Sequence, residues 1–225
     1  MSKKPIYGMP TAGSSSDPRR PLGDLPIDAH PGAVKGDSPM LEPARRASQT
    51  LWDTWGKIRN AHETVSDRQR LAAAAQKAVE RALSATDKAL SALQKNRDVL
   101  EAKISSVVCP RSPDALAPEI RAHFRGTSSP FAEASKLLAS GDRRSVAAIL
   151  SAPAYLSGLD DEQHRVLRDL ARQRFCPEEA QAVKDIDQAA GRVMMTAGHI
   201  SETLAPRIRE WRGSDDKALE GLANA

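Results

Sequence analysis

The longest regular pattern of apolar and polar positions runs from Ala44 to Cys109, where apolar residues recur every three or four positions. The segment contains no proline and one glycine. A seven-residue spacing is typical of a helix that packs along another helix. Every seventh residue gives one row that is apolar at eight of nine positions: Leu51, Ile58, Val65, Ala72, Val79, Thr86, Leu93, Leu100 and Val107. We predict a long, coiled-coil-like helix over residues 44–109.

A second apolar row in this segment is interrupted, and the interruption leaves a helical hairpin open as an alternative. Thr64, Ser66 and Asp67 are residue types that often begin helices, so a break near 62–67 would divide the segment in two. A further row is rich in alanine, which would let a neighbouring helix approach closely. The pattern therefore favours a bundle over a symmetric two-stranded zipper. The interruptions are His62, Gln69, Gln76 and Arg97.

Residues 1–43 have a different composition, with eight of the fifteen prolines and five of the thirteen glycines. Proline removes a backbone donor and glycine adds backbone freedom, so neither a helix nor a central strand fits this segment. We predict an extended or disordered N-terminal arm. Tyr7, Leu22 and Leu25 could anchor it on neighbouring chains, and its deletion would then leave helicity intact but weaken assembly.

Residues 110–225 are predicted to form a C-terminal helical region that begins after the double proline stop at Pro110 and Pro113. Short helices are indicated by Pro130 after Ser129, by Asp142 as a cap, and by a capping box from Asp160 to Gln163. A second long helix is predicted from Pro177 to about Leu204. It could pack against the first long helix or against a symmetry-related copy. Its apolar row is Val183, Ile186, Ala190, Val193, Ala197, Ile200 and Leu204.

The fold class that follows is all-α, an elongated long-helix or helical-bundle architecture with a proline-rich N-terminal arm. Aromatic residues make up only 4% of the chain, and none lies between Trp55 and Phe124. We therefore expect the long helix to have little core of its own and to be stabilised by neighbours, which could be other chains. No run reaches the roughly 20 apolar residues of a membrane-spanning helix, and the first residues do not look like a secretory signal.

The sequence contains none of the motifs that usually mark an enzyme, a metal site or a nucleotide site. We expect no catalytic residue, no metal and no cofactor. His62 is expected to be a polar register position or to lie on a solvated face, and His164 and His199 are expected at the surface. Cys176 follows two arginines and precedes a helix, which could activate a thiol, but a small core or capping residue is the favoured interpretation.

The net charge of +4 comes from residues 44–109, which carry a surplus of five positive charges. Acidic residues are interspersed with the basic ones, a pattern typical of a solvated helix face. A nucleic-acid binder usually concentrates its positive charge. A nucleic-acid-associated accessory protein that uses the basic long helix is therefore the alternative function.

Residues Ser145–His164, SVAAILSAPAYLSGLDDEQH, resemble a segment of small, mostly uncharacterised helical proteins encoded by tailed phages and prophages. The resemblance implies a bacterial or phage setting and a virion or assembly role. The expected location is then the virion or the bacterial cytoplasm. No catalytic residue follows from the resemblance.

These observations together predict a non-enzymatic structural or interaction protein, a component of a phage capsid, neck or tail or an assembly factor. It would act by helix packing and arm docking. The expected partners are other protein chains, as a homo-oligomer or with other virion proteins, with weak nucleic-acid contact and no membrane. The helix rows expected to bind partners are Leu83, Leu90, Leu93, Leu100, Ile104, Val183, Ile186, Val193 and Ile200.

Overall fold

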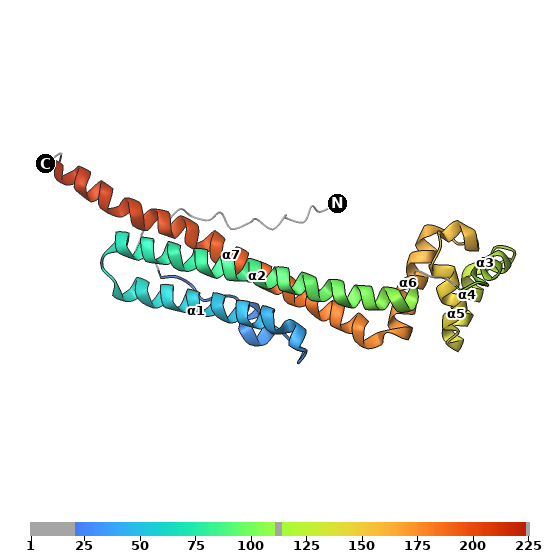
Figure 1. The fold of residues 1–225 in the computed structure, drawn as a ribbon. Coiled ribbons are helices and arrows are strands. Elements are labelled where there is room, and N and C mark those ends of the chain that lie inside the picture. The colour runs from blue at the N-terminus through green and yellow to red at the C-terminus, as the bar shows by residue number, and fades with distance from the viewer. Residues whose placement is uncertain (1–20, 111–113, 224–225) are drawn as a thin grey trace, which may run out of the picture.

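A computed structural model describes residues 21–110 and 114–223 of the chain, and all regular elements in these ranges are helices. Three long helices form a rod, and four short helices gather as a head at one end of it (Figure 1). The all-α, elongated architecture predicted from the sequence is confirmed. The head lies where the second long helix ends and the last one begins.

The rod consists of α1 (Glu42–Thr64), α2 (Arg68–Val108) and α7 (Pro177–Ala223), which all contact one another. Residues 65–67 separate α1 from α2, so the segment is a helical hairpin and not a single helix. The turn is fixed at Asp67, whose carboxylate accepts a hydrogen bond from the backbone N–H of Arg70 at 2.9 Å. At 1.5 Å per residue, α2 alone is about 60 Å long.

One continuous core fills the rod and extends into the head. The row that begins at Leu51 lies along this core, as its spacing predicted. Alanines such as Ala72, Ala75 and Ala82 are also buried, and their small side chains let α1, α2 and α7 approach closely. The expectation that the span without aromatics has little core of its own is therefore wrong, because helices of the same chain cover it.

Most of the residues predicted to bind partner chains are buried inside the chain itself. Because α7 runs back along α2, each of these helices covers the apolar row of the other. Their assignment to partner chains is therefore wrong. Leu83 and Leu90 are half-buried against the same core. The buried residues are Leu93, Leu100, Ile104, Val183, Ile186, Val193 and Ile200.

The described part of the arm also packs on the chain's own rod. Its 3-10 turns are η1 (Ile27–Ala29), η2 (Pro31–Ala33) and η3 (Pro39–Leu41). Leu22 and Leu25 are buried against the same core as Leu41. The two leucines are thus anchors as expected, but within the chain, whereas Tyr7 lies outside the described residues. Asn96 of α2 donates a hydrogen bond to the Met40 carbonyl at 2.9 Å and fixes the end of the arm.

Replacing Leu25 with alanine is therefore expected to destabilise the fold itself by about 2–3 kcal/mol, because a buried apolar side chain is lost. Ile27 is the matched control, since its side chain is 87% exposed two residues later. Urea unfolding of a dilute chain, followed by circular dichroism, measures both variants. Equal stabilities for Leu25→Ala and Ile27→Ala would show that the arm does not dock on the rod.

The head contains α3 (Ala117–Arg125), α4 (Pro130–Ser140), α5 (Arg143–Leu150), η4 (Ala154–Ser157) and α6 (Asp161–Phe175). Its predicted helix starts are confirmed. Asp142 accepts from the Ser145 N–H at 3.0 Å. Asp160 and Gln163 form the reciprocal capping box, at 2.7 and 3.2 Å.

Helix α7 runs well past Leu204, where the sequence analysis expected it to end, and includes Pro206. A proline inside a helix leaves the carbonyl four residues earlier without its usual donor. Pro206 lies on the exposed face, where water can reach that carbonyl. Beyond it, Ile208 and Trp211 are buried. Trp211 stacks on His62 of α1 with ring centroids 5.2 Å apart, so tertiary packing holds the helix beyond the proline.

Candidate functional site

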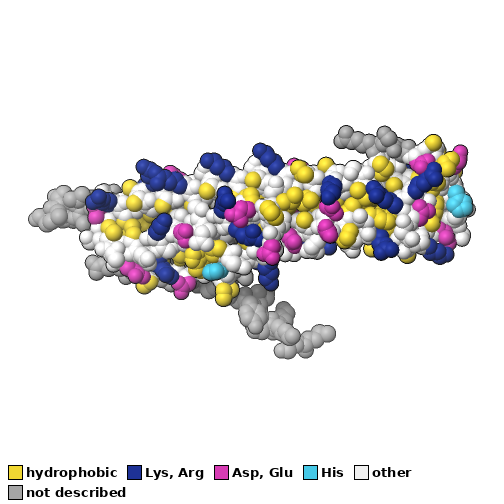
Figure 2. Space-filling model, turned by 60° about the horizontal axis from the view of Figure 1, so that its bottom comes forward, with side chains coloured by type: hydrophobic (Ala, Val, Ile, Leu, Met, Phe, Trp, Pro, Cys, Tyr) yellow, Lys and Arg dark blue, Asp and Glu magenta, His cyan; other side chains and the backbone are white. Residues whose placement is uncertain are grey.

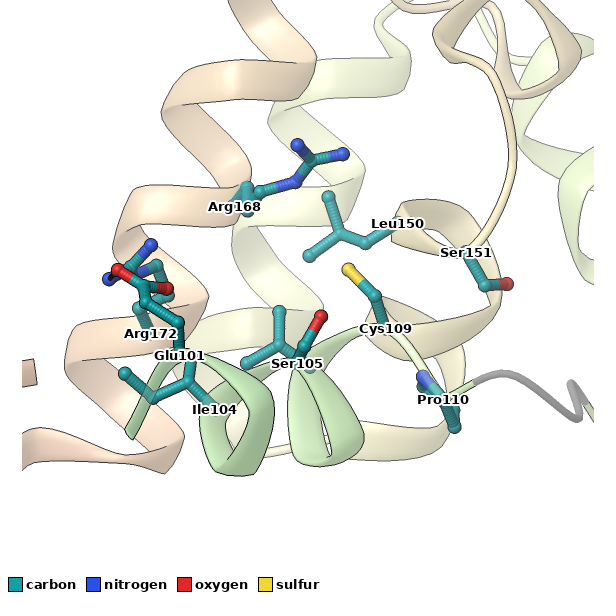
Figure 3. Close-up of a pocket in the computed structure, with 10 residues that line it drawn as sticks. Glu101, Ile104, Ser105, Cys109, Pro110, Leu150, Ser151, Arg168 and Arg172 are labelled. Atoms are coloured by element: carbon teal, nitrogen blue, oxygen red, sulfur yellow. Dashed lines mark hydrogen bonds and ion pairs between the residues drawn. The ribbon is translucent and has the colours of Figure 1, made fainter. Parts of the chain in front are cut away.

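A pocket of about 490 Å³ opens where α2 ends against the head, and we call it the junction pocket (Figure 3). It lies between α2, the chain that follows α2, the end of α5, and α6. Ile104, Val108 and Leu150 give it an apolar floor. The lining residues are Glu101, Ile104, Ser105, Val108, Cys109, Pro110, Leu150, Ser151, Arg168 and Arg172.

The two arginines of the pocket have different surroundings. Arg172 pairs with Glu101 at 2.7 Å, and Figure 3 shows the two side chains close together. Glu101 is also 3.9 Å from Arg97, which pairs with Asp187 of α7 at 2.9 Å. This network joins α2, α6 and α7. No carboxylate pairs with Arg168 among the described residues, and its side chain lies over Leu150 and near Cys109.

The thiols at this junction are held in their protonated form. Burial raises the pKa of Cys109, against the opposing effect of the nearby Arg168 guanidinium. Burial also raises the pKa of Cys176, and the charge of Glu179 adds to it. Because the thiolate is the nucleophile, both groups are weak nucleophiles at neutral pH. Cys176 is buried, which supports its interpretation as a small core residue.

The burial of the histidines differs from what the sequence predicts. His164 was expected at the surface, but it is buried on the inner face of α6 with Leu167 and Ala171. His62 is not on a solvated face either, because it is buried and stacks on Trp211. His199 is half-buried, with its ring centroid 6.1 Å from that of Trp55.

The pKa of His164 is lowered, first by burial and then by the positive charge of Arg168, while backbone groups of Ile149 and Ala152 and the charge of Asp161 oppose the shift. The folded state therefore binds a proton at His164 less readily than the unfolded state does. This contribution to stability is full above the unfolded pKa of about 6.5 and is lost as the pH falls below it.

We expect the melting temperature of the native chain to fall between pH 7.5 and pH 5.5 by more than that of His164→Gln, which has no titrating group at this position. The difference between the native chain and the variant in this fall of melting temperature isolates His164 from the other titrating groups. Differential scanning calorimetry at both pH values measures it. Parallel slopes would contradict the assignment of a neutral, buried imidazole.

A second hollow lies on the rod between α7 and η1, and we call it the α7 groove. Its volume is about 370 Å³, and Met195 stands at its edge with 73% of its surface exposed. Ile27 of η1 and Met194 are also exposed large apolar side chains. This site is not among those predicted from the sequence. The groove is lined by Pro26, Ala29, Arg192, Met195, Thr196, Gly198, His199 and Glu202.

In the ranges that the structure describes, no three His, Cys, Asp or Glu side chains are grouped so that they could hold a metal ion. None of the helices described there combines the length and the apolar character needed to cross a bilayer.

Comparison with family models, curated proteins and solved structures gives no match for this chain. Function must therefore be inferred from its residues and their arrangement.

Proposed function

We propose that the chain is a non-enzymatic structural or interaction protein, a rod whose surface holds partner proteins. The observation that carries this proposal is the position of its exposed apolar side chains. Met194 and Met195 lie on α7 and Ile27 lies on η1, which packs against α7, whereas Leu116, Tyr155 and Leu170 lie on the head. Large apolar side chains left exposed on the surface indicate contact sites for other macromolecules. A rod with contacts at its head and along its length is suited to joining subunits.

A virion setting is proposed from the resemblance of Ser145–His164 to phage-encoded helical proteins. This segment spans most of α5, all of η4 and the start of α6. Tyr155, near its middle, is 69% exposed. An exposed tyrosine offers a large apolar surface together with a hydroxyl, and such residues are frequent at the centres of interfaces. The head is thus proposed to dock on capsid, neck or tail proteins, in the particle or during its assembly in the bacterial cytoplasm.

The test is quantitative mass spectrometry of purified particles and of their assembly intermediates from cells that express the chain. We expect a fixed number of copies per particle or per intermediate for the native chain, and at least a tenfold loss for Tyr155→Asp. Val99→Asp is the matched control, because Val99 is an exposed apolar residue on the rod. Absence of the native chain from both particles and intermediates would contradict the virion proposal.

The alternative, a nucleic-acid-associated accessory protein, is favoured by one observation on α2. Six basic side chains are exposed along this helix, with Glu80, Asp87 and Asp98 also exposed among them. Figure 2 shows Lys and Arg side chains spread along the molecule with acidic side chains between them. The six residues are Arg70, Lys77, Arg81, Lys88, Lys95 and Lys103.

Binding to labelled double-stranded DNA and to RNA at several salt concentrations tests this alternative. Phosphate contacts would make affinity fall steeply with salt, whereas apolar helix packing would not. Affinity that falls with salt, and falls further in Lys88→Ala/Lys95→Ala, would support nucleic-acid binding as the function. Under the main proposal we expect only weak binding.

A further inference from the structure

No element in the ranges 21–110 and 114–223 covers the α7 groove, although its composition is that of a covered surface. Met195 is 73% exposed and Ile27 is 87% exposed, on two elements that pack against each other. Pro26 and Ala29 extend the apolar surface on η1. A protein that exposes large apolar side chains together around a hollow usually buries them against a partner.

The backbone of α7 also has open space beside it here. Gly191 and Gly198 are seven residues apart on the same side of the helix. A Cβ atom added at either one would meet nothing within 4 Å. Glycine lowers helix stability relative to alanine, so a glycine needs a packing reason in the middle of a helix. The described part of the fold supplies none, whereas a second helix crossing between Gly191 and Gly198 would use the space above both.

The charges at the two ends of the groove identify the partner. Arg192 and Glu202 both line it, and neither forms an ion pair in the part of the chain that the structure describes. They lie five residues on either side of Ala197. In an antiparallel pair of identical helices whose two-fold axis passes the outer face of α7 at the level of Ala197, which itself faces the core, Arg192 of one copy would therefore face Glu202 of the other, twice. A surface that is complementary to itself in this way fits a two-fold interface.

We propose that the α7 groove is a self-association surface, at which two copies of the chain pack antiparallel through α7. The inference rests on the proposed function of an interaction protein and names one of its partners, a second copy of the chain. Met195 of each copy would enter the groove of the other beside Gly198 and His199. The two Arg192–Glu202 pairs would close the ends of the contact and set its direction.

Sedimentation equilibrium of the full chain over a wide range of concentrations tests this surface. We expect the mass to rise from 24.3 kDa towards twice that value. Met195→Glu should raise the dissociation constant by about tenfold or more, because a charge replaces the central apolar contact. Val99→Glu, at another exposed apolar site, on α2, should leave the constant unchanged. Circular dichroism of each variant establishes that it is folded.

Charge reversal tests the pairing itself. Arg192→Glu alone would set two carboxylates against each other and weaken the dimer about tenfold, and Glu202→Arg alone would do the same with two guanidinium groups. The double variant Arg192→Glu/Glu202→Arg should recover native affinity. A native chain that remains monomeric, or a dimer that is insensitive to Met195→Glu, would overturn the inference. A monomer that still assembles into particles would overturn this inference alone and leave the proposed function standing.

Discussion

Replacing Leu93 with alanine is expected to lower the free energy of unfolding by about 2–5 kcal/mol, because it removes a buried side chain from the close-packed contact inside the rod. Leu93 lies in the middle of α2 with 1% of its surface exposed. A cavity at this point removes contacts that the surrounding helices can restore only by shifting. Urea unfolding, followed by the helical circular dichroism signal, measures the change.

Val99→Ala provides the control on the same helix. Its side chain is 62% exposed, so the free energy of unfolding should change by less than about 0.5 kcal/mol. Both variants should give the same result over a wide range of chain concentrations. If Leu93→Ala were as mild as Val99→Ala and instead reduced the mass of an oligomer, the apolar row would face another chain.

Replacing Trp211 with alanine is expected to lower the free energy of unfolding by about 3–5 kcal/mol. Trp211 is fully buried and stacks on His62, so it ties the last part of α7 to the end of α1. Without this contact, no other side chain of similar size that is described after Pro206 is buried to offset the cost of this proline within the helix. Hydrogen–deuterium exchange should show faster exchange of the backbone amides after Pro206, together with a lower melting temperature.

Arg209→Ala is the matched control for Trp211→Ala, because Arg209 lies on the exposed face of the same turns of α7. We expect little change in stability or in amide exchange for this variant. Slow exchange beyond Pro206 that persists in Trp211→Ala would show that something other than this tryptophan holds the helix.

The sequence predicted the helices because their signals are local. The row that includes Leu51 and Leu100 gave the inward face of α1 and α2, and the caps at Asp142 and Asp160 gave the starts of α5 and α6. The break between α1 and α2 was also foreseen as an alternative, from residues whose side chains compete for backbone hydrogen bonds. These features depend on neighbours within a few residues.

The partners of the apolar rows could not be predicted in this way. A seven-residue spacing indicates that a helix packs against another helix, but it does not indicate whether that helix belongs to the same chain. The return of α7 along α2 depends on the head that connects them, which no periodicity describes. The helix beyond Pro206 likewise depends on the burial of Trp211 by α1. A local rule that disfavours proline was overridden there by packing.

The candidate sites were predicted least well, although some signals were present. His164, Leu167 and Ala171 have the spacing of one helix face, which indicates burial in spite of the charged neighbours of His164. Gly191 and Gly198 likewise interrupt an otherwise good helix at a seven-residue interval. No local sequence pattern indicates the junction pocket, because its walls come from α2, α5 and α6, which are far apart in the sequence.

Helices α2 and α7 of one chain cover each other, and this leaves the exposed surface of the rod free for partners. Zero-length carbodiimide coupling tests it directly, because Lys103 of α2 and Glu179 of α7 form an ion pair at 2.5 Å. Chains labelled with ¹⁵N and unlabelled chains are unfolded, mixed, refolded together and coupled, and the joined peptides are identified by mass spectrometry. We predict Lys103–Glu179 links only between peptides of the same isotope. Mixed-isotope links at the frequency of random pairing would contradict this packing, because α2 would then pack on α7 of another chain.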